Sequence, residues 1–133
     1  MDKLETKYKI LIIEDNKDLV SIMKAFLENN NFSVNFAYGG KAGLSEVKKD
    51  TPDLIMLDII MPDMDGRDVL IELKKDPSTK EIPVIIITGK EEQFDRSYLI
   101  ELGAYEYFTK PYDRYNLLRQ INNIFDKKAK GIL

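Results

Sequence analysis

The chain alternates short apolar runs with amphipathic segments five times, and this alternation restricts the folds open to it. The apolar runs have the length of strands, and the segments between them carry apolar residues at the 3.6-residue spacing of helices. Such alternation predicts a doubly wound α/β fold, with a five-stranded parallel sheet and helices on both faces. The expected strands span residues 9–13, 32–37, 54–58, 84–88 and 105–109.

One helix is expected after each strand. Asn16 is a capping residue that begins the first helix, and the asparagines at 29–31 end it. Gly43 lies inside the second helix and lowers its stability by about 1 kcal/mol relative to alanine. The other expected boundaries are a second helix opened by residues 39–40, a third after Gly66, a fourth over 92–102 capped by Gly103, and a fifth that follows Pro111 and ends near Lys127.

Each helix has an apolar face that is expected to lie on the sheet. The segment 54–58 is apolar until its last residue, as in a central strand that is buried on both faces, whereas 32–37 is more polar, as in an edge strand. The expected inward residues are Leu19, Ile22, Met23 and Phe26 in the first helix, Leu44 and Val47 in the second, Val69, Leu70 and Leu73 in the third, and Leu117, Leu118, Ile121, Ile124 and Phe125 in the fifth.

Length and composition fit one folded domain. We expect residues 1–133 to form a single domain, with its core at about 8–127 and short tails. Hydrophobic residues make up 44% and charged residues 32%, a balance typical of folded rather than disordered chains. No apolar run approaches the roughly 20 residues of a membrane-spanning helix, and the charged first residues do not resemble a signal peptide. A cytoplasmic location is therefore expected.

The residues that the chain lacks exclude several classes of function. It has no cysteine and no histidine. This excludes a disulfide framework, a thiol nucleophile, a Ser-His-Asp mechanism, and thiolate or imidazole metal sites. The net charge of −3 gives no electrostatic reason to expect nucleic acid or an anionic membrane as a direct partner.

Chemically useful side chains follow four of the expected strands. Glu14 and Asp15 follow the first, Asp58 ends the third, Thr88 ends the fourth and Lys110 follows the fifth. Because parallel strands end at one edge of a sheet, where open α/β folds bind ligands, these groups are expected to form one pocket. Three carboxylates and one ammonium leave a charge that matches one divalent cation, and an all-oxygen site favours Mg²⁺. An aspartate in this setting can act as a nucleophile toward phosphorus.

Each of these residues also has a purely structural interpretation. Asp58 alone could cap a turn before Pro62, and the acidic pair Glu14 and Asp15 could stabilise the N-terminus of a helix. Lys110 could be a surface lysine. The four strand ends taken together favour the site.

The same residues resemble a known family. The chain is similar to the response regulator receiver domain of two-component signalling over about residues 8–125. The resemblance implies a flavodoxin-like sheet in the strand order 2-1-3-4-5. The motifs that carry it are Glu14-Asp15, Asp58 followed by Met61-Pro62-Asp63-Met64-Asp65-Gly66, Thr88-Gly89 and Lys110-Pro111.

The resemblance also implies a role for each residue of the pocket. Asp58 would accept a phosphoryl group from a sensor histidine kinase or a histidine phosphotransfer protein, as in a phosphorelay. Thr88 and Lys110 would bind that phosphoryl group. The implied ligands of Mg²⁺ are Glu14, Asp15, Asp58 and the backbone carbonyl of Ile60. The chain would then be a signalling module rather than an enzyme with a separate substrate.

The resemblance further implies how the signal leaves the pocket. Tyr107 matches the aromatic residue that turns inward when Thr88 is drawn to the phosphoryl group. The output surface would be the fourth helix, the fifth strand and the fifth helix, recognised by a downstream protein or a fused output domain. A monomer or weak dimer is expected, since Tyr105-Glu106 replaces an acidic pair used in dimer contacts. We also predict a cis peptide bond before Pro111, because cis costs little before proline and would direct the Lys110 ammonium into the pocket.

Two positions predict a long-lived aspartyl phosphate. Ile60 and Lys90 lie where the family influences attack by water, and neither has an acidic or amide side chain that could orient one. Three alternatives remain at this point: a receiver trimmed from a larger regulator or hybrid kinase, a Mg²⁺-dependent aspartyl phosphatase, and a scaffold that ignores phosphate. The phosphatase is disfavoured because such enzymes place a second aspartate at the position of Ile60.

Overall fold

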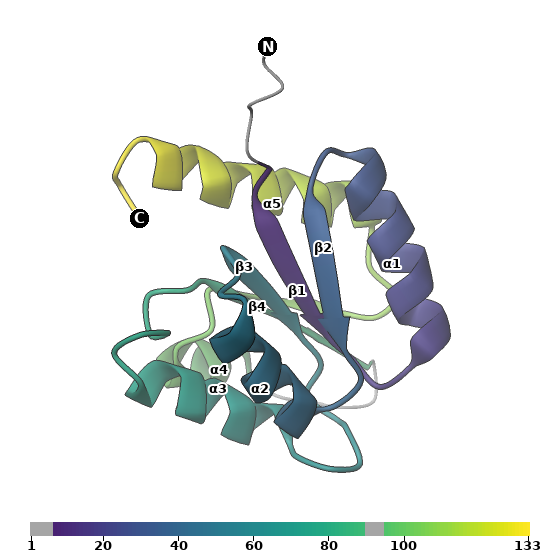
Figure 1. Ribbon diagram of the computed structural model, residues 1–133, viewed down its shortest axis with the longest axis vertical. Helices are drawn as coiled ribbons and strands as arrows, with labels where there is room; N and C mark the ends of the chain where they lie inside the picture. Colours follow the sequence, from purple (N-terminus) through teal and green to yellow (C-terminus); the bar gives the residue numbers. More distant parts are fainter. Residues whose placement is uncertain (1–6, 90–94) are drawn as a thin grey trace.

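The sheet of this protein is parallel and five-stranded, in the order β2-β1-β3-β4-β5, as predicted. The computed structural model describes residues 7–89 and 95–133 (Figure 1). β2 and β5 form the edges, and the register places Ile13 beside Leu57 and Thr88 beside Thr109. The strands are β1 (Lys9–Ile13), β2 (Ser33–Ala37), β3 (Leu54–Leu57), β4 (Val84–Thr88) and β5 (Glu106–Thr109).

The helices cover both faces of this sheet. In Figure 1, α1 and α5 lie on one face, while α2, α3 and α4 lie on the other. Polar side chains cap four of the N-termini: Asn16, Asp65, Asp95 and Asp113 each accept a backbone N–H of the helix that follows. The helices are α1 (Lys17–Asn29), α2 (Gly40–Lys49), α3 (Gly66–Lys75), α4 (Arg96–Leu102) and α5 (Arg114–Ala129).

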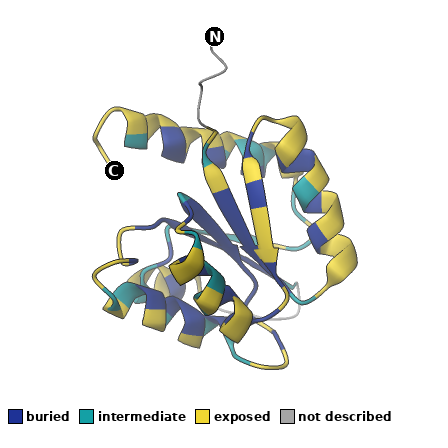
Figure 2. Ribbon diagram, viewed as in Figure 1, coloured by how far each residue is buried: buried dark blue, intermediate teal, exposed yellow. Residues whose placement is uncertain are grey.

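The core consists of two apolar layers, one on each face of the sheet. Alternate strand residues face opposite layers, so that Ile10 and Ile12 pack under α1 and α5 while Leu11 and Ile13 pack under α2, α3 and α4. Figure 2 shows the central strands as buried and the outer surfaces of the helices as exposed. Within the described residues, no helix is long and apolar enough to cross a membrane.

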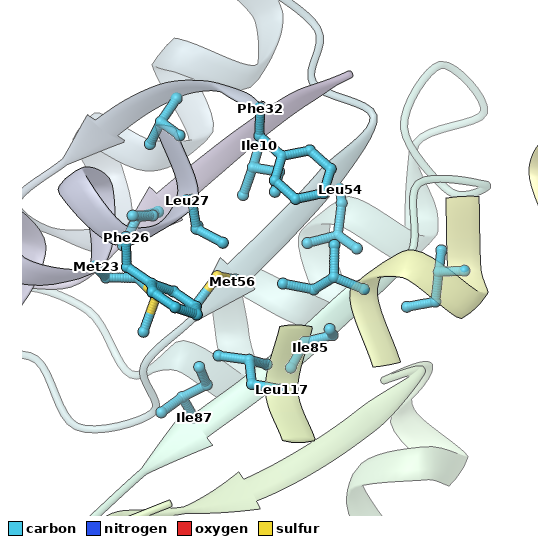
Figure 3. Close-up of a cluster of buried hydrophobic side chains, with 14 of the residues drawn as sticks. Ile10, Met23, Phe26, Leu27, Phe32, Leu54, Met56, Ile85, Ile87 and Leu117 are labelled. Atoms are coloured by element: carbon cyan, nitrogen blue, oxygen red, sulfur yellow. The ribbon is translucent and has the colours of Figure 1, made fainter. Parts of the chain in front are cut away.

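The predicted inward face of α1 is partly wrong. Leu19 and Ile22 are 39% and 59% exposed, whereas Val20 and Leu27 are buried beside Met23 and Phe26. Figure 3 shows Met23, Phe26 and Leu27 grouped with Met56 of the central strand. Both sets of residues satisfy the helical period, and the packing of α1 against the apolar layer of the sheet buries the second set.

Several boundaries also differ from the prediction. β3 ends at Leu57, so Asp58 lies just beyond it. Two strands, β2 and β5, each begin one residue later than expected, and α5 continues to Ala129. Strand ends depend on ladder hydrogen bonds with neighbours that are distant in the sequence. Gly103 caps α4 with a left-handed backbone, as predicted. The expected beginning of α4 at 92–94 lies outside the described residues, and the helix starts at Arg96.

Gly43 has a packing reason that the sequence did not reveal. A Cβ at this position would lie 2.6–2.9 Å from the side chain of Ile13. The glycine therefore permits α2 to pack closely on β1, which offsets its low helix propensity.

Candidate functional site

The functional groups meet at the carboxyl edge of the sheet because backbone hydrogen bonds align the strand ends. The N–H of Asp58 donates to the carbonyl of Ile13 at 3.0 Å, which brings the start of the β3–α3 loop beside Glu14. The N–H of Lys110 donates to the carbonyl of Thr88 at 2.7 Å. The predicted residues from β1, β3, β4 and β5 are thus placed at one edge.

Three carboxylates converge there. Oxygen atoms of Glu14, Asp15 and Asp58 all lie within 4.8 Å of one another. Glu14 and Asp58 are buried, with 8% and 6% of their surface exposed, and Asp15 is the most accessible of the three. Like charges this close in a poorly solvated pocket repel one another, so the arrangement favours a bound cation.

Lys110 contributes a positive charge from the other side of the pocket. Its Nζ donates to Oε1 of Glu14 at 3.0 Å and lies 3.8 Å from Oδ2 of Asp58. Its side chain is 26% exposed, so water screens this ion pair only partly. The Lys110–Pro111 peptide bond is cis, as predicted.

Burial and a neighbouring charge make Asp58 hard to ionise without a cation. Desolvation, together with the charge of the neighbouring Glu14 carboxylate, raises the pKa of Asp58 from 3.8 to about 7. The Lys110 ammonium and, to a smaller extent, the backbone N–H of Ile60 lower this pKa. The metal-free pocket therefore holds a proton on Asp58 through part of the physiological pH range.

The donor set fits a hard divalent cation. The three carboxylates offer only oxygen ligands, and a backbone carbonyl such as that of Ile60 would add another. Zn²⁺ prefers nitrogen and sulfur ligands, which histidine and cysteine would supply and which this chain lacks. A cation at this point would reduce the repulsion that raises the pKa of Asp58.

The remaining predicted residues surround this group. Thr88 is fully buried at the end of β4. Tyr107 is half-buried and packs against the apolar layer under α3 and α4. The side chain of Ile60 is 49% exposed, two residues after Asp58. Lys90, the other position expected to influence attack by water, lies outside the described residues.

Three further residues shape the pocket in ways that the sequence patterns did not indicate. The backbone N–H of Asn16 donates to Oε2 of Glu14 at 3.1 Å and fixes that carboxylate. Tyr112 lies near Glu14. Its burial, and to a smaller extent the charge of Glu14, raises the pKa of its hydroxyl to about 12, so this hydroxyl is neutral at physiological pH. Asp63 anchors the β3–α3 loop to α2. In the sequence, Asn16 was predicted only as a helix cap and Asp63 only as part of the motif after Asp58, while Tyr112 was marked only by its position beside Pro111.

The raised pKa of Asp58 predicts an unusual pH dependence of stability in the metal-free protein. Between about pH 4 and pH 7 the folded state holds a proton that the unfolded chain releases, so stability falls as the pH rises. We expect the free energy of unfolding to decrease by an amount on the order of 2 kcal/mol between about pH 5 and pH 8. Urea unfolding in the presence of a metal chelator measures this decrease. Asp58→Asn removes the titrating group and is the control. No histidine titrates in this range. An unchanged pH dependence in that variant would contradict the assignment.

Known proteins match both the sequence and the fold. Residues 10–122 match the family model of the response regulator receiver domain. The response regulator ArlR of Staphylococcus saprophyticus is 36% identical over 122 residues, which are 92% of this chain and 54% of that protein. The protein PilH of Pseudomonas aeruginosa is 35% identical over 116 residues, which are 87% of this chain and 96% of PilH.

A solved structure gives the same result. The response regulator receiver domain protein (CheY-like) from Methanospirillum hungatei JF-1 superposes with a TM-score of 0.86 at 27% identity, over 95% of this chain and 99% of that one. This chain spans about half the length of ArlR. The carboxylates of Glu14, Asp15 and Asp58 cluster as they do in receiver domains, which bind Mg²⁺. The chain therefore belongs to the response regulator receiver domains, the signalling modules of two-component systems.

Proposed function

We propose that this protein is a phosphorylation-activated switch in which Asp58 accepts a phosphoryl group from a phosphohistidine on a partner protein. One observation carries the proposal: Asp58 lies buried among Glu14, Asp15 and Lys110 at the carboxyl edge of the sheet. Family membership supports the partner class, because receiver domains interact with histidine kinases and output domains. Residues 1–133 contain no histidine, so they do not supply the phosphohistidine themselves.

The metal site follows from the same residues. Glu14, Asp15, Asp58 and the backbone carbonyl of Ile60 would hold Mg²⁺, and the three carboxylates are already close enough to share one ion. When bound, the ion would neutralise phosphoryl oxygens and lower the pKa of Asp58. The N–H of Asn16 would keep Glu14 turned toward the site.

In the transfer step, a carboxylate oxygen of Asp58 attacks phosphorus in line with the leaving group. A P–O bond to Asp58 forms while the P–N bond of the phosphohistidine breaks, and the imidazole nitrogen leaves with the electron pair. The Lys110 ammonium neutralises charge on the phosphoryl oxygens, and the Thr88 hydroxyl donates to one of them. Asp58 must be ionised for the attack, so its raised pKa makes the metal-free protein a poor acceptor.

The output surface would be α4, β5 and α5. Tyr107 lies in β5, packed against the layer under α4, where movement of Thr88 could be relayed to it. Arg96 of α4 forms an ion pair with Glu106 of β5 at 2.6 Å, so a rearrangement of Tyr107 would act on the start of α4. A downstream protein or an output domain would recognise the altered surface. We propose that residues 1–133 act as one receiver unit.

The test of this function is Mg²⁺-dependent phosphorylation. Purified protein incubated with acetyl phosphate is expected to gain one phosphoryl group per chain by intact mass spectrometry, and the gain is expected to disappear when EDTA removes Mg²⁺. If the protein bound neither Mg²⁺ nor the phosphoryl mimic beryllofluoride, the result would instead favour a scaffold that does not respond to phosphate. Continuous turnover of a phosphomonoester would favour an aspartyl phosphatase.

The phosphorylated form is expected to be long-lived, and Ile60→Asn is expected to shorten its lifetime. Hydrolysis needs a water held behind the phosphorus by a polar group, and the exposed Ile60 side chain offers only an apolar surface there. An asparagine amide would orient that water, and the decay should accelerate by a factor on the order of ten. The decay of phospho-Asp58 at fixed Mg²⁺ measures this, with Ile60→Leu as the matched control. Equal decay in the Asn and Leu variants would mean that Ile60 does not set the lifetime.

A further inference from the structure

Asp63 connects the loop that follows Asp58 to the N-terminus of α2. It lies in the loop between β3 and α3, and both of its carboxylate oxygens face the start of α2. Oδ1 accepts the backbone N–H of Gly40 and Oδ2 accepts that of Lys41, each at 3.1 Å. The residue before α2 is Gly39, which has no side chain to cap the helix. Asp63 therefore satisfies two of the free N–H groups of α2 from a segment more than 20 residues away.

The contact leaves little spare room. A Cβ on Gly39 would lie 2.8–3.0 Å from the carboxyl group of Asp63, and a Cβ on Gly40 would lie 2.8 Å from the Cβ of Met64. Gly39 has an extended backbone with φ of 179°, which any residue adopts, so its lack of a side chain serves the approach of Asp63. The N–H groups of Lys41 and Gly40 also lower the pKa of Asp63. The carboxylate is thus ionised and tied to α2 at neutral pH.

The position of this anchor matters because of what the loop carries. Asp58 and Ile60 lie in its first half, two residues apart. The Ile60 side chain is half exposed, so its packing does little to fix the direction of its backbone carbonyl. At the far end, the N–H of Gly66 donates to the carbonyl of Ile59 at 2.7 Å and closes the loop. Between these points, Asp63 ties the loop to a helix.

We propose that Asp63 is a positioning residue, which holds the carbonyl of Ile60 and the carboxylate of Asp58 in the arrangement that binds Mg²⁺ by tying the β3–α3 loop to α2. Asp63 does not touch the ion or the phosphoryl group. The inference rests on the proposed function, because it assigns a role toward the same ion. It also implies a reciprocal effect, since an ion that fixes the loop must stabilise the start of α2.

The test compares Asp63→Ala with Asp53→Ala. Asp53 is the matched control because its Oδ2 also accepts a distant backbone N–H, that of Lys9 at 2.8 Å, but at the opposite edge of the sheet. Isothermal titration calorimetry with Mg²⁺ alone is expected to show a dissociation constant about fivefold higher for Asp63→Ala than for the parent. This ratio corresponds to the free energy of one lost capping interaction. Asp53→Ala is expected to bind like the parent. Asp63→Asn keeps one acceptor oxygen, so its affinity is expected to lie closer to the parent.

A second readout does not depend on the ion. Amide hydrogen exchange in the metal-free protein is expected to be faster at Gly40 and Lys41 in Asp63→Ala and unchanged there in Asp53→Ala.

The reciprocal effect is tested by adding the ion. Mg²⁺ is expected to slow exchange at these amides in the parent and to have little effect on them in Asp63→Ala. Gly39→Ala, which would displace the carboxylate, is expected to weaken Mg²⁺ binding in the parent but not further in Asp63→Ala.

The outcomes separate the two proposals. Parent-like Mg²⁺ affinity in Asp63→Ala would overturn the role of Asp63 and leave the proposed function intact. A parent protein that binds no Mg²⁺ would overturn the proposed function and this role with it. Equal weakening of Mg²⁺ binding in Asp63→Ala and Asp53→Ala would reduce Asp63 to a general contribution to stability, which also overturns the proposal.

Discussion

Asp58→Asn is expected to abolish phosphorylation by acetyl phosphate, leaving no measurable incorporation under conditions in which the parent gains one phosphoryl group per chain. An amide oxygen is a poor nucleophile toward phosphorus, and its neutral side chain also removes a charge that the metal site needs. Asp58 is the carboxylate that adjoins the Lys110 ammonium and the metal-binding acids at the sheet edge. The adduct in the parent should be stable in acid and labile in base, as an acyl phosphate is.

The control for this experiment is Asp53→Asn, which changes an aspartate at the opposite edge of the sheet and is expected to label like the parent. Circular dichroism should confirm that both variants are folded. Full labelling of Asp58→Asn would show that another carboxylate, such as Glu14 or Asp15, accepts the phosphoryl group. The proposed chemistry would then have to be reassigned to that residue.

Gly66→Ala is expected to lower the free energy of unfolding by about 3 kcal/mol and to impair Mg²⁺ binding. A Cβ at Gly66 would overlap the backbone carbonyl of Asp58 and would lie 2.7 Å from the Cα of Ile59. Both neighbours are backbone atoms of the loop that carries the site, so they cannot move aside as a flexible side chain would. The overlap would also disturb the hydrogen bond from Gly66 to Ile59. Urea unfolding and Mg²⁺ titration measure the two effects.

Gly131→Ala separates this overlap from the general effect of replacing glycine. Gly131 has φ of 72°, and a Cβ added to it would meet no atom within 4 Å, so its substitution strains only the backbone. The expected cost is about 1 kcal/mol, with no change in Mg²⁺ binding. If Gly66→Ala were no more destabilising than Gly131→Ala, the loop would be more adaptable than its packing indicates.

The elements and the site were predictable because their signals are local. Each apolar run ends where a polar or charged residue begins, and parallel strands bring those ends to one edge of the sheet. Asp58, Glu14 and Lys110 could therefore be assigned to one pocket although Lys110 is 96 residues from Glu14. The motif around Asp58 indicated the family, and the family resemblance in turn predicted the strand order, which the structure confirms.

The rest depended on how the elements pack. The face of α1 was ambiguous in the sequence, because Leu19 and Ile22 fit the helical period as well as Val20 and Leu27 do. Only the packing of α1 against the sheet selects which set is buried, since the apolar layer beneath it covers a limited arc of the helix.

Electrostatics and capping were decided in the same way. The pKa of Asp58 is raised because the fold excludes water from it and places Glu14 beside it, and neither effect can be read from the residues next to Asp58 in the chain. Asp63 reads as an ordinary turn residue in the sequence. Its role at the start of α2 exists only because the β3–α3 loop passes close to Gly39 and Gly40, an approach that tertiary packing alone creates.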